Sequence, residues 1–298
     1  MAIFYCSVHK RNFDFWNHSA FRKNTKTGYQ SNQKCTVYPK LISKKTFAGK
    51  QIKIICDSDE FLTKTNSNGY FSLQIRKKIN QTPQIINCDT HQEITSHQTY
   101  PVFFPEPHGK LAIISDIDET ILHSHTKSAT KRIYTTLFKP PHRRGVINFT
   151  QELFLAFKAK DPRYFYVSKS ETNLFKIISE FLISNNLPKG ILLLTPYLNY
   201  KKLIKNKKEL DFKKNTIEKI ITLSPNKEFI LVGDDSQKDV EIYTDVARKF
   251  PNQISSIFIS QTKNTLNSEK LKNWQLLKNT AVSTHYFKKN ESFNPKLL

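Results

Sequence analysis

Five short apolar runs, separated by segments with helical periodicity, constrain the fold of the second half of the chain. The runs are KLAIIS, RYFYVS, GILLLT, EFILVG and ISSIFIS, all between residues 110 and 260. Near-continuous apolar runs of this length are typical of strands that are buried on both faces. The segments between them carry apolar residues three and four apart, for example Leu174, Ile177, Ile178, Phe181 and Leu182. Strands that alternate with helices predict a doubly wound parallel α/β sheet.

The part of the chain before this sheet has a different pattern. Residues 28–107 contain short alternating runs and a strong turn signal, NSNGY, which together predict a small β-sandwich-like domain. Residues 1–27 indicate an irregular basic arm, and the proline-rich YPVFFPEPHGK indicates a linker. We expect the α/β domain to occupy residues 108–262 and a basic helix with a polar, mobile tail to occupy residues 263–298.

Polar residues follow the first two apolar runs. Asp116, Asp118 and Thr120 come directly after the first run, at alternate positions that can face one ligand. Ser168 ends the second run beside SKSETN, where we expect a helix to begin. A hydroxyl and the backbone N–H groups of a helix N-terminus would form a cradle for an anion. Because open α/β sheets bind ligands beyond the carboxyl ends of their strands, we expect these groups to lie together.

Further candidates belong to the second half of the sheet. Lys213 or Lys214 comes immediately before the helix expected behind the fourth strand, and that strand runs into GDDSQKD, with Asp234, Asp235 and Asp239. Carboxylate oxygens, without Cys or His, suit Mg²⁺. An ionised aspartate can attack phosphorus while a cation and a lysine neutralise the developing charge. The set therefore predicts a site that binds a divalent cation and a phosphate group together.

Simpler interpretations apply to the first motif on its own. Asp118 and Thr120 could be helix caps, and this is the better reading of an isolated DxDxT. A calcium loop would use Asp116, Asp118 and Thr120 as its first, third and fifth positions. It fails because Ile121 stands where Gly is required and Lys127 where Glu is expected. The order and placement of the whole set favour the phosphate site.

The composition restricts the cellular setting and the partners. Lys and Arg number 47 against 25 Asp and Glu, which gives a formal net charge of +22. Such a charge attracts phosphates on nucleic acid or on an anionic membrane surface, although Lys-rich proteins that bind neither also occur. The four cysteines have neither zinc-site spacing nor the density of a disulfide framework. Since no run approaches about 18 apolar residues, we expect a cytoplasmic protein without a transmembrane segment that touches membranes only at their surface.

Three stretches resemble one known family: IISDIDETI, YFYVSKS and FILVGDDSQKDVEIYTDVARKFPNQISSIFIS. The chain, over about residues 28–262, is similar to the haloacid dehalogenase superfamily and specifically to its actin patch-associated phosphatidate phosphatases. The resemblance implies a sheet of haloacid dehalogenase type with a small cap insert at about residues 124–162, which contains an apolar helix at TQELFLAF. It also implies an Mg²⁺-dependent phosphoric monoester hydrolase with a role in lipid metabolism.

The resemblance assigns a role to each candidate that reacts with the phosphate or binds it. Asp116 would be the nucleophile that forms an aspartyl-phosphate, and Asp118 the general acid/base. Thr120, Ser168 and the lysine would bind the phosphate. Lys213 is preferred over Lys214 because its spacing to Ile217 is closer to the family pattern.

The same resemblance assigns the metal ligands. Asp234 would hold Mg²⁺ together with the Asp116 carboxylate and the backbone carbonyl of Asp118, and Asp239 would be a supporting acid. Three departures from the family pattern stand out: Ser168 is followed by Lys-Ser-Glu rather than Pro-Trp, Glu119 replaces a common Asp, and GDDSQ replaces GDSGQ. None removes a catalytic group, but the first changes a segment expected to border the substrate.

Three functions follow as hypotheses. The leading one is dephosphorylation of phosphatidate to diacylglycerol at an anionic membrane surface, with a small cap and exposed aromatics such as Phe103 and Phe104 that favour such a substrate. The second is a phosphatase for a soluble or nucleic-acid phosphomonoester. The third is a non-catalytic scaffold on the same fold that binds a membrane or a protein partner.

Overall fold

The computed structural model describes residues 2–7, 48–65, 70–75, 82–94, 100–101, 103–104, 109–122, 145–171, 174–195, 212–235, 238–262 and 267–295. The chain forms two compact units. One consists of Met1–Tyr5, Ser72–Thr82 and Thr95–Leu298, and the other of Cys6–Phe71 and Pro83–Ile94. The domain boundaries predicted at residues 27, 107 and 262 lie in or beside stretches outside the described residues and stay predictions.

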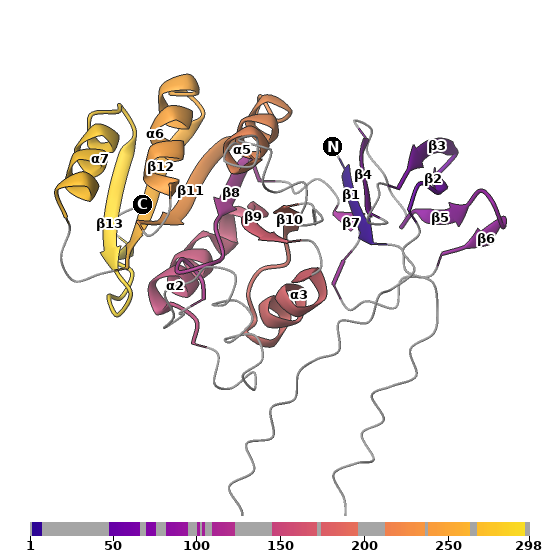
Figure 1. Ribbon diagram of the computed structural model, residues 1–298, viewed down its shortest axis with the longest axis horizontal. Helices are drawn as coiled ribbons and strands as arrows, with labels where there is room; N and C mark the ends of the chain where they lie inside the picture. The colour runs from indigo at the N-terminus through magenta and orange to yellow at the C-terminus, as the bar shows by residue number, and fades with distance from the viewer. Residues whose placement is uncertain are drawn as a thin grey trace, which may run out of the picture. The chain divides into compact units, whose positions relative to one another are not determined.

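Six parallel strands form the sheet of the larger unit, in the order β10-β9-β8-β11-β12-β13 (Figure 1). They are β8 (Leu111–Ser115), β9 (Arg163–Glu171), β10 (Ile191–Thr195), β11 (Glu228–Asp234), β12 (Ile254–Gln261) and β13 (Ser283–Lys288). The chain moves from β8 outward to β10, then returns to the other side of β8 for β11, β12 and β13. This confirms the predicted doubly wound parallel sheet and puts its switch point between β8 and β11.

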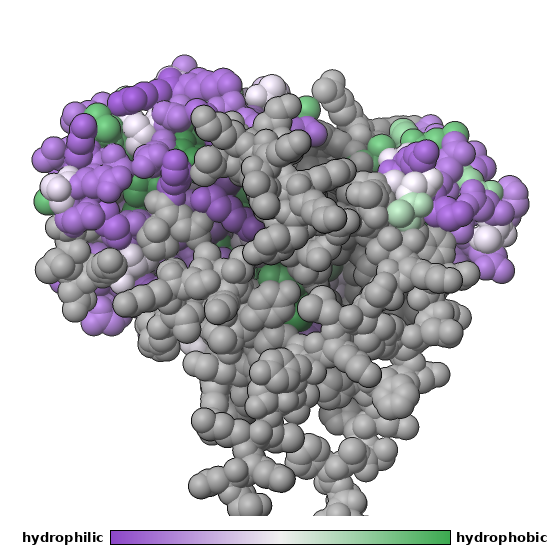
Figure 2. All heavy atoms as spheres, in the orientation of Figure 1, coloured by the Kyte–Doolittle hydropathy of each residue, from purple (hydrophilic) through white to green (hydrophobic). Residues whose placement is uncertain are grey.

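Helices cover both faces of this sheet (Figure 1). One layer contains α2 (Asn148–Phe157), followed by the 3₁₀ turn η3 (Lys158–Lys160), and α3 (Phe175–Ser184). The other contains α5 (Phe212–Thr222), α6 (Asp239–Lys249) and α7 (Ser268–Lys278). Strand residues alternate between the two layers: in β8, Ile113 packs with the first cluster, whereas Ala112 and Ile114 pack with the second. Hydrophilic side chains cover the outer surface near α6 and α7 (Figure 2).

The apolar helix expected in the cap insert is α2, and it belongs to the core. Its Phe149, Leu153, Phe154 and Phe157 are buried together with side chains of the sheet. The last three follow Phe149 by four, five and eight residues, so all four side chains lie on one stripe of the helix. This apolar stripe packs on the sheet, and α2 is therefore a core helix and not part of a cap. The rest of the predicted insert, residues 123–144, lies outside the described residues.

The C-terminal region differs from its prediction. The basic helix exists as α7, but the polar tail that we expected to be mobile forms β13, parallel to β12. Phe287 of β13 is buried and stacks on Phe149 with ring centroids 3.8 Å apart. Because β13 is an edge strand with one fully buried side chain, its sequence carries no apolar run that would reveal it.

Short strands in two sheets make up the N-terminal region. One sheet has the order β3 (Asp59–Lys64), β2 (Gln51–Cys56), β5 (Gln84–Asn87) and β6 (Gln92–Glu93), and the other β4 (Tyr70–Ile75), β1 (Ala2–Ser7) and β7 (Phe103–Phe104). The β domain predicted before the α/β sheet is therefore present as strands, with antiparallel pairing in the four-stranded sheet. The arm expected to be irregular contributes β1, and the NSNGY turn lies mainly outside the described residues.

The segment expected to be a linker is anchored by an aromatic side chain. Tyr100 is buried, and its hydroxyl donates to the carbonyl of Gly190 at 2.6 Å and accepts from the Gly190 amide at 3.0 Å. Phe104 is partly buried against the core, so it is not the exposed aromatic that we expected, and the Phe103 side chain lies outside the described part of the chain. None of the described helices is long and apolar enough to cross a membrane.

Phe287→Ala should lower the free energy of unfolding by about 3–5 kcal/mol, because a buried aromatic ring is removed and a cavity remains. Leu155→Ala on α2, where the side chain is 67% exposed, is the control and should change it by about 0.5 kcal/mol or less. Urea denaturation measures both. Equal effects of the two substitutions would contradict the docking of β13.

Candidate active site

The site begins where β8 ends. The amide of Asp116 donates to the carbonyl of Val232 at 2.8 Å, so the backbone continues the pairing of β8 with β11. The chain then turns tightly: the amides of Ile121 and Leu122 both donate to the carbonyl of Ile117 at 3.0 Å. This loop, residues 116–122, is called the catalytic loop here because it carries the predicted nucleophile, and it lies at the switch point of the sheet.

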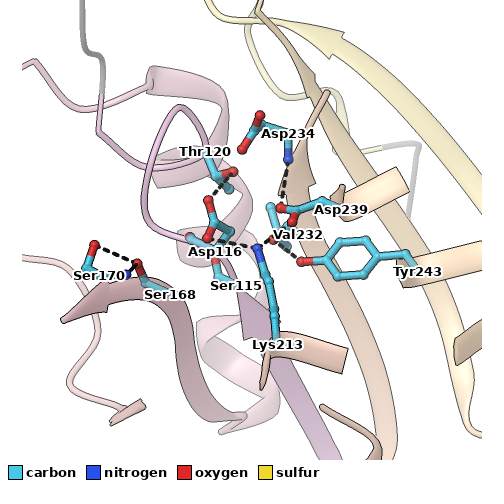
Figure 3. Close-up of polar contacts among 10 residues, drawn as sticks. All are labelled: Ser115, Asp116, Thr120, Ser168, Ser170, Lys213, Val232, Asp234, Asp239 and Tyr243. Carbon is cyan, nitrogen blue, oxygen red and sulfur yellow. Dashed lines mark hydrogen bonds and ion pairs between the residues drawn. The ribbon is translucent and has the colours of Figure 1, made fainter. Parts of the chain in front are cut away.

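A buried lysine joins two carboxylates at the centre of the site (Figure 3). Lys213 Nζ lies 2.8 Å from Asp116 Oδ1 and 2.6 Å from Asp239 Oδ1, and the exposed fractions of the three side chains are 1%, 2% and 0%. Lys213 comes from the first turn of α5, and Asp239 is the first residue of α6. Three segments that are distant in sequence therefore meet through one ammonium group.

The neighbouring lysine points elsewhere. Lys214 Nζ lies 2.6 Å from Asp245 Oδ2, in a pair whose side chains are 33% and 49% exposed. Lys213, which we preferred from the sequence, is thus the lysine that the structure places beside the carboxylates. It lies within α5 rather than immediately before it.

Burial controls the charges of this cluster. Burial raises the pKa of Asp116 to about 6, and the charge of Asp239 raises it too, while Lys213 lowers it. Burial lowers the pKa of Lys213, but the charges of Asp116 and Asp239 more than offset this and hold it well above its usual value. Lys213 is therefore a cation at neutral pH, where Asp116 is mostly ionised.

Asp234 completes a group of three acidic side chains. Carboxylate oxygens of Asp116, Asp234 and Asp239 lie within 4.8 Å of one another, and all three residues are buried. The amide of Asp234 also donates to Asp239 Oδ2 at 3.4 Å. Asp118 is buried in the catalytic loop, but its carboxylate is not part of this group among the described residues. Hard oxygen donors at this spacing suit a divalent cation.

Two further residues, Gly233 and Tyr243, lie at the site, and the sequence identified neither as part of it. Gly233 leaves room for it: a Cβ at residue 233 would lie 2.7 Å from Asp239 Oδ2 and 2.7 Å from the Tyr243 ring. Tyr243 donates from its hydroxyl to the carbonyl of Val232 at 3.0 Å, and Lys213 Nζ lies 5.9 Å from the centre of its ring. Tyr243 belongs to the apolar periodicity of α6, which predicts only that it is a core residue.

The hydroxyl groups predicted for the site are both buried. Thr120 Oγ1 lies 3.5 Å from Asp116 Oδ2, at the limit of a hydrogen bond. Ser168 Oγ donates to Ser170 Oγ at 2.9 Å and accepts from the Ser170 amide at 3.0 Å. Figure 3 shows both hydroxyl groups together with Asp116.

The helix expected at SKSETN is not there, so the prediction of an anion cradle at its N-terminus was wrong. Strand β9 continues to Glu171, and α3 begins at Phe175. The apolar run that marks β9 stops at Val167, but pairing with β10 extends beyond it, to Glu171 opposite Thr195. Ser168 therefore lies within a strand.

Asp235, the second acidic residue of GDDSQKD, has its partners outside the cluster. It accepts from the Thr262 amide at 2.9 Å and pairs with Lys270 Nζ at 2.9 Å. It also accepts from the hydroxyl of Tyr286. The adjacent aspartates thus differ in role: Asp234 faces the carboxylates, and Asp235 links β11 to the C-terminal elements.

Lys213→Met should lower the free energy of unfolding by about 3–5 kcal/mol at pH 8 in metal-free protein, because two buried carboxylates lose their cation. The loss should be smaller at pH 5. Without Lys213 the pKa of Asp116 rises further, so the carboxyl group takes up a proton as the pH falls and tolerates burial.

Lys214→Met is the matched control on the same helix. It breaks only an exposed pair and should change stability by about 0.5 kcal/mol or less at both pH values. Urea denaturation at pH 5 and pH 8 measures both variants. Equal losses for the two lysines would show that the buried pairs do not stabilise the fold.

Comparison with known proteins identifies relatives. The family model described as "Phosphatidate phosphatase APP1, catalytic domain" matches residues 111–261. Phosphatidate phosphatase APP1 of Saccharomyces cerevisiae is 30% identical over 221 residues, which are 72% of this chain and 37% of that protein. Uncharacterized protein C29B5.04c of Schizosaccharomyces pombe is 23% identical over 211 residues, or 67% of this chain and 34% of that protein.

A solved structure, "Structure of Pnkp1/Rnl/Hen1 complex", covers 74% of this chain and 58% of its own at 12% identity and a TM-score of 0.36, a level that supports no conclusion. The chain spans about a third of the length of the curated relatives it matches. The family match covers half of the chain and includes all seven predicted site residues from Asp116 to Asp239. The chain therefore belongs to the phosphatidate phosphatase APP1 catalytic-domain family.

Proposed function

We propose that this chain is an Mg²⁺-dependent phosphatase of haloacid dehalogenase type that removes the phosphate of phosphatidate through an aspartyl-phosphate on Asp116. The observation that carries the proposal is the buried contact of Lys213 with Asp116 and Asp239, inside the region that matches the family. This contact holds the Asp116 carboxylate next to the Lys213 cation, at the edge of the sheet where the parallel strands end. Ligands of open α/β sheets bind at this edge, so an anionic substrate can approach there.

The donor set fits a magnesium ion. Three buried acidic side chains lie together, and Lys213 is paired with two of them, Asp116 and Asp239. Asp116 and Asp234 would hold the ion together with the backbone carbonyl of Asp118, and Asp239 would support the site through Lys213. When bound, Mg²⁺ would neutralise the substrate phosphate and reduce its repulsion of the Asp116 carboxylate.

The first step of the proposed reaction is a transfer of the phosphoryl group to the protein. A carboxylate oxygen of Asp116 forms a bond to phosphorus, and the bond from phosphorus to the ester oxygen breaks. Asp118 gives a proton to the departing oxygen, so that diacylglycerol leaves as an alcohol. Lys213 and the hydroxyl groups of Thr120 and Ser168 stabilise the charge on the phosphoryl oxygens.

The second step regenerates the protein. Water forms a bond to phosphorus, and Asp118 takes a proton from it. The bond between phosphorus and the Asp116 oxygen breaks, which yields inorganic phosphate and the free carboxylate. One carboxyl group thus acts as nucleophile and the other transfers a proton in both steps.

The substrate rests on the relative and on charge. The curated S. cerevisiae relative is a phosphatidate phosphatase, and this chain carries a formal net charge of +22. Basic surfaces are attracted to anionic lipids with about 1 kcal/mol per nearby Lys or Arg, and salt screens this attraction. We therefore propose that the protein acts at the surface of membranes that contain phosphatidate.

The test is phosphate release from phosphatidate in mixed micelles, with a soluble phosphate ester in parallel. Wild-type protein should release phosphate from the lipid with Mg²⁺ and not with EDTA. Asp116→Asn should lower the rate by at least about 10³-fold, because the nucleophile is lost. Asp245→Asn, which alters only an exposed pair with Lys214, is the control and should keep the activity.

Other results of this assay would support a different substrate or a non-catalytic role. Activity on the soluble ester or on a nucleic-acid phosphomonoester alone would keep the mechanism and reject the lipid. Vesicle binding that does not weaken with salt would contradict the electrostatic attraction. Absence of phosphate release from every substrate would favour the non-catalytic scaffold.

A further inference from the structure

We propose that the C-terminal segment, residues 283–295, is part of the catalytic apparatus, in which Lys289 acts as a positioning residue by holding Glu119 of the catalytic loop. The proposal rests on the proposed function and deepens it. The family match ends at residue 261, so the whole C-terminal segment lies outside it.

Glu119 stands between two residues with proposed roles, Asp118 and Thr120, in an uncommon backbone conformation. Its φ of 56° lies in the left-handed region, which is sparsely populated by residues other than Gly, Asn and Asp. Such residues persist where surrounding contacts hold them. The amide of Glu119 donates to the carbonyl of Leu122 at 3.0 Å, and its buried side chain pairs with Lys289 Nζ. The Lys289 contact therefore acts directly on the shape of the catalytic loop.

Lys289 is itself fixed on both sides. Before it, Phe287 of β13 is buried and stacks on Phe149 of α2. After it, the amide of Phe293 donates to Glu152 Oε2 at 2.6 Å, and the Phe293 ring meets Phe149 edge-on at 5.4 Å. The turn that carries Lys289 is thus tied to α2 at two points, which makes it a rigid support.

The same segment contacts the second acidic loop. Tyr286 of β13 donates to Asp235, the residue next to Asp234. The Tyr286 ring also packs on Trp274 of α7, with centroids 4.9 Å apart. Both loops that carry proposed metal ligands are therefore held by neighbouring residues of one strand and the turn that follows it.

Charge gives a reason for these contacts. Glu119 and Asp235 are two further buried carboxyl groups, each next in sequence to a residue of the proposed site. Uncompensated, they would repel an anionic phosphate. Lys289 pairs with Glu119, and Lys270 pairs with Asp235 at 2.9 Å, so that the C-terminal elements supply cations to both. The catalytic residues inside the family match thus depend on basic residues beyond it.

The test compares Lys289→Met, Lys289→Arg and Lys288→Met in the full chain. Lys288 is the adjacent, exposed residue and serves as the matched control. Three measurements apply to each variant: kcat and KM for Mg²⁺-dependent phosphate release, the melting temperature, and hydrogen exchange of the Glu119, Ile121 and Leu122 amides, which are hydrogen-bonded in the loop.

Lys289→Met should lower kcat by about tenfold or more with KM within about twofold, as is usual when a residue that orients a ligand is lost. The loop amides should exchange at least about tenfold faster. Lys289→Arg should restore most of the kcat and most of the protection of these amides. Glu119→Gln, which removes the charge from the other side of the pair, should accelerate loop exchange in the same way.

Two results would overturn the proposal. One is loop exchange and kcat in Lys289→Met that equal those of Lys288→Met. The other is a lowered melting temperature in Lys289→Met, together with a lower kcat and a changed KM, that Lys289→Arg does not restore. That result would make Lys289 a structural residue only. If wild-type protein releases no phosphate, the proposed function fails, while hydrogen exchange still decides whether Lys289 holds the loop.

Discussion

The ion pairs of one buried lysine organise the proposed active site. Lys213 brings α5 to the end of β8 through Asp116 and to the start of α6 through Asp239. Buried carboxylates repel one another and lose their hydration, and the ammonium group between Asp116 and Asp239 offsets both costs. The cluster therefore combines a structural role, in which it joins three segments, with a chemical one, in which it keeps Asp116 mostly charged at neutral pH despite a pKa raised by burial to about 6.

The topology of the sheet explains why these groups meet. The strand order reverses between β8 and β11, and because these two strands are neighbours, the loops after them lie side by side at one edge of the sheet. Gly233 then allows Asp239 to approach β11 closely, because a side chain at this position would collide with it. The C-terminal elements complete the arrangement, since Asp235 and Glu119 both face basic or hydroxyl groups from beyond residue 261.

Much of this could be predicted from sequence, for identifiable reasons. Strands buried on both faces leave apolar runs, and residues at their carboxyl ends must share one edge, which was enough to place Asp116 near Asp234. The edge strand β13 leaves no such run, and the end of β9 is polar, so both were assigned wrongly. The pair of Lys289 with Glu119 joins residues 170 positions apart and has no local signal. Tyr100 likewise has no local signal in its proline-rich stretch that would predict its contact with Gly190.

The most direct test of the central claim is to trap the covalent intermediate. Protein turning over phosphatidate with Mg²⁺ is quenched in acid and treated with borohydride, which reduces an acyl phosphate to an alcohol. Peptide mass spectrometry should then find homoserine in place of aspartate at residue 116 and at no other aspartate, and only when substrate and Mg²⁺ are both present. Steady turnover with residue 116 unmodified, or with the modification at another carboxyl group, would contradict the account.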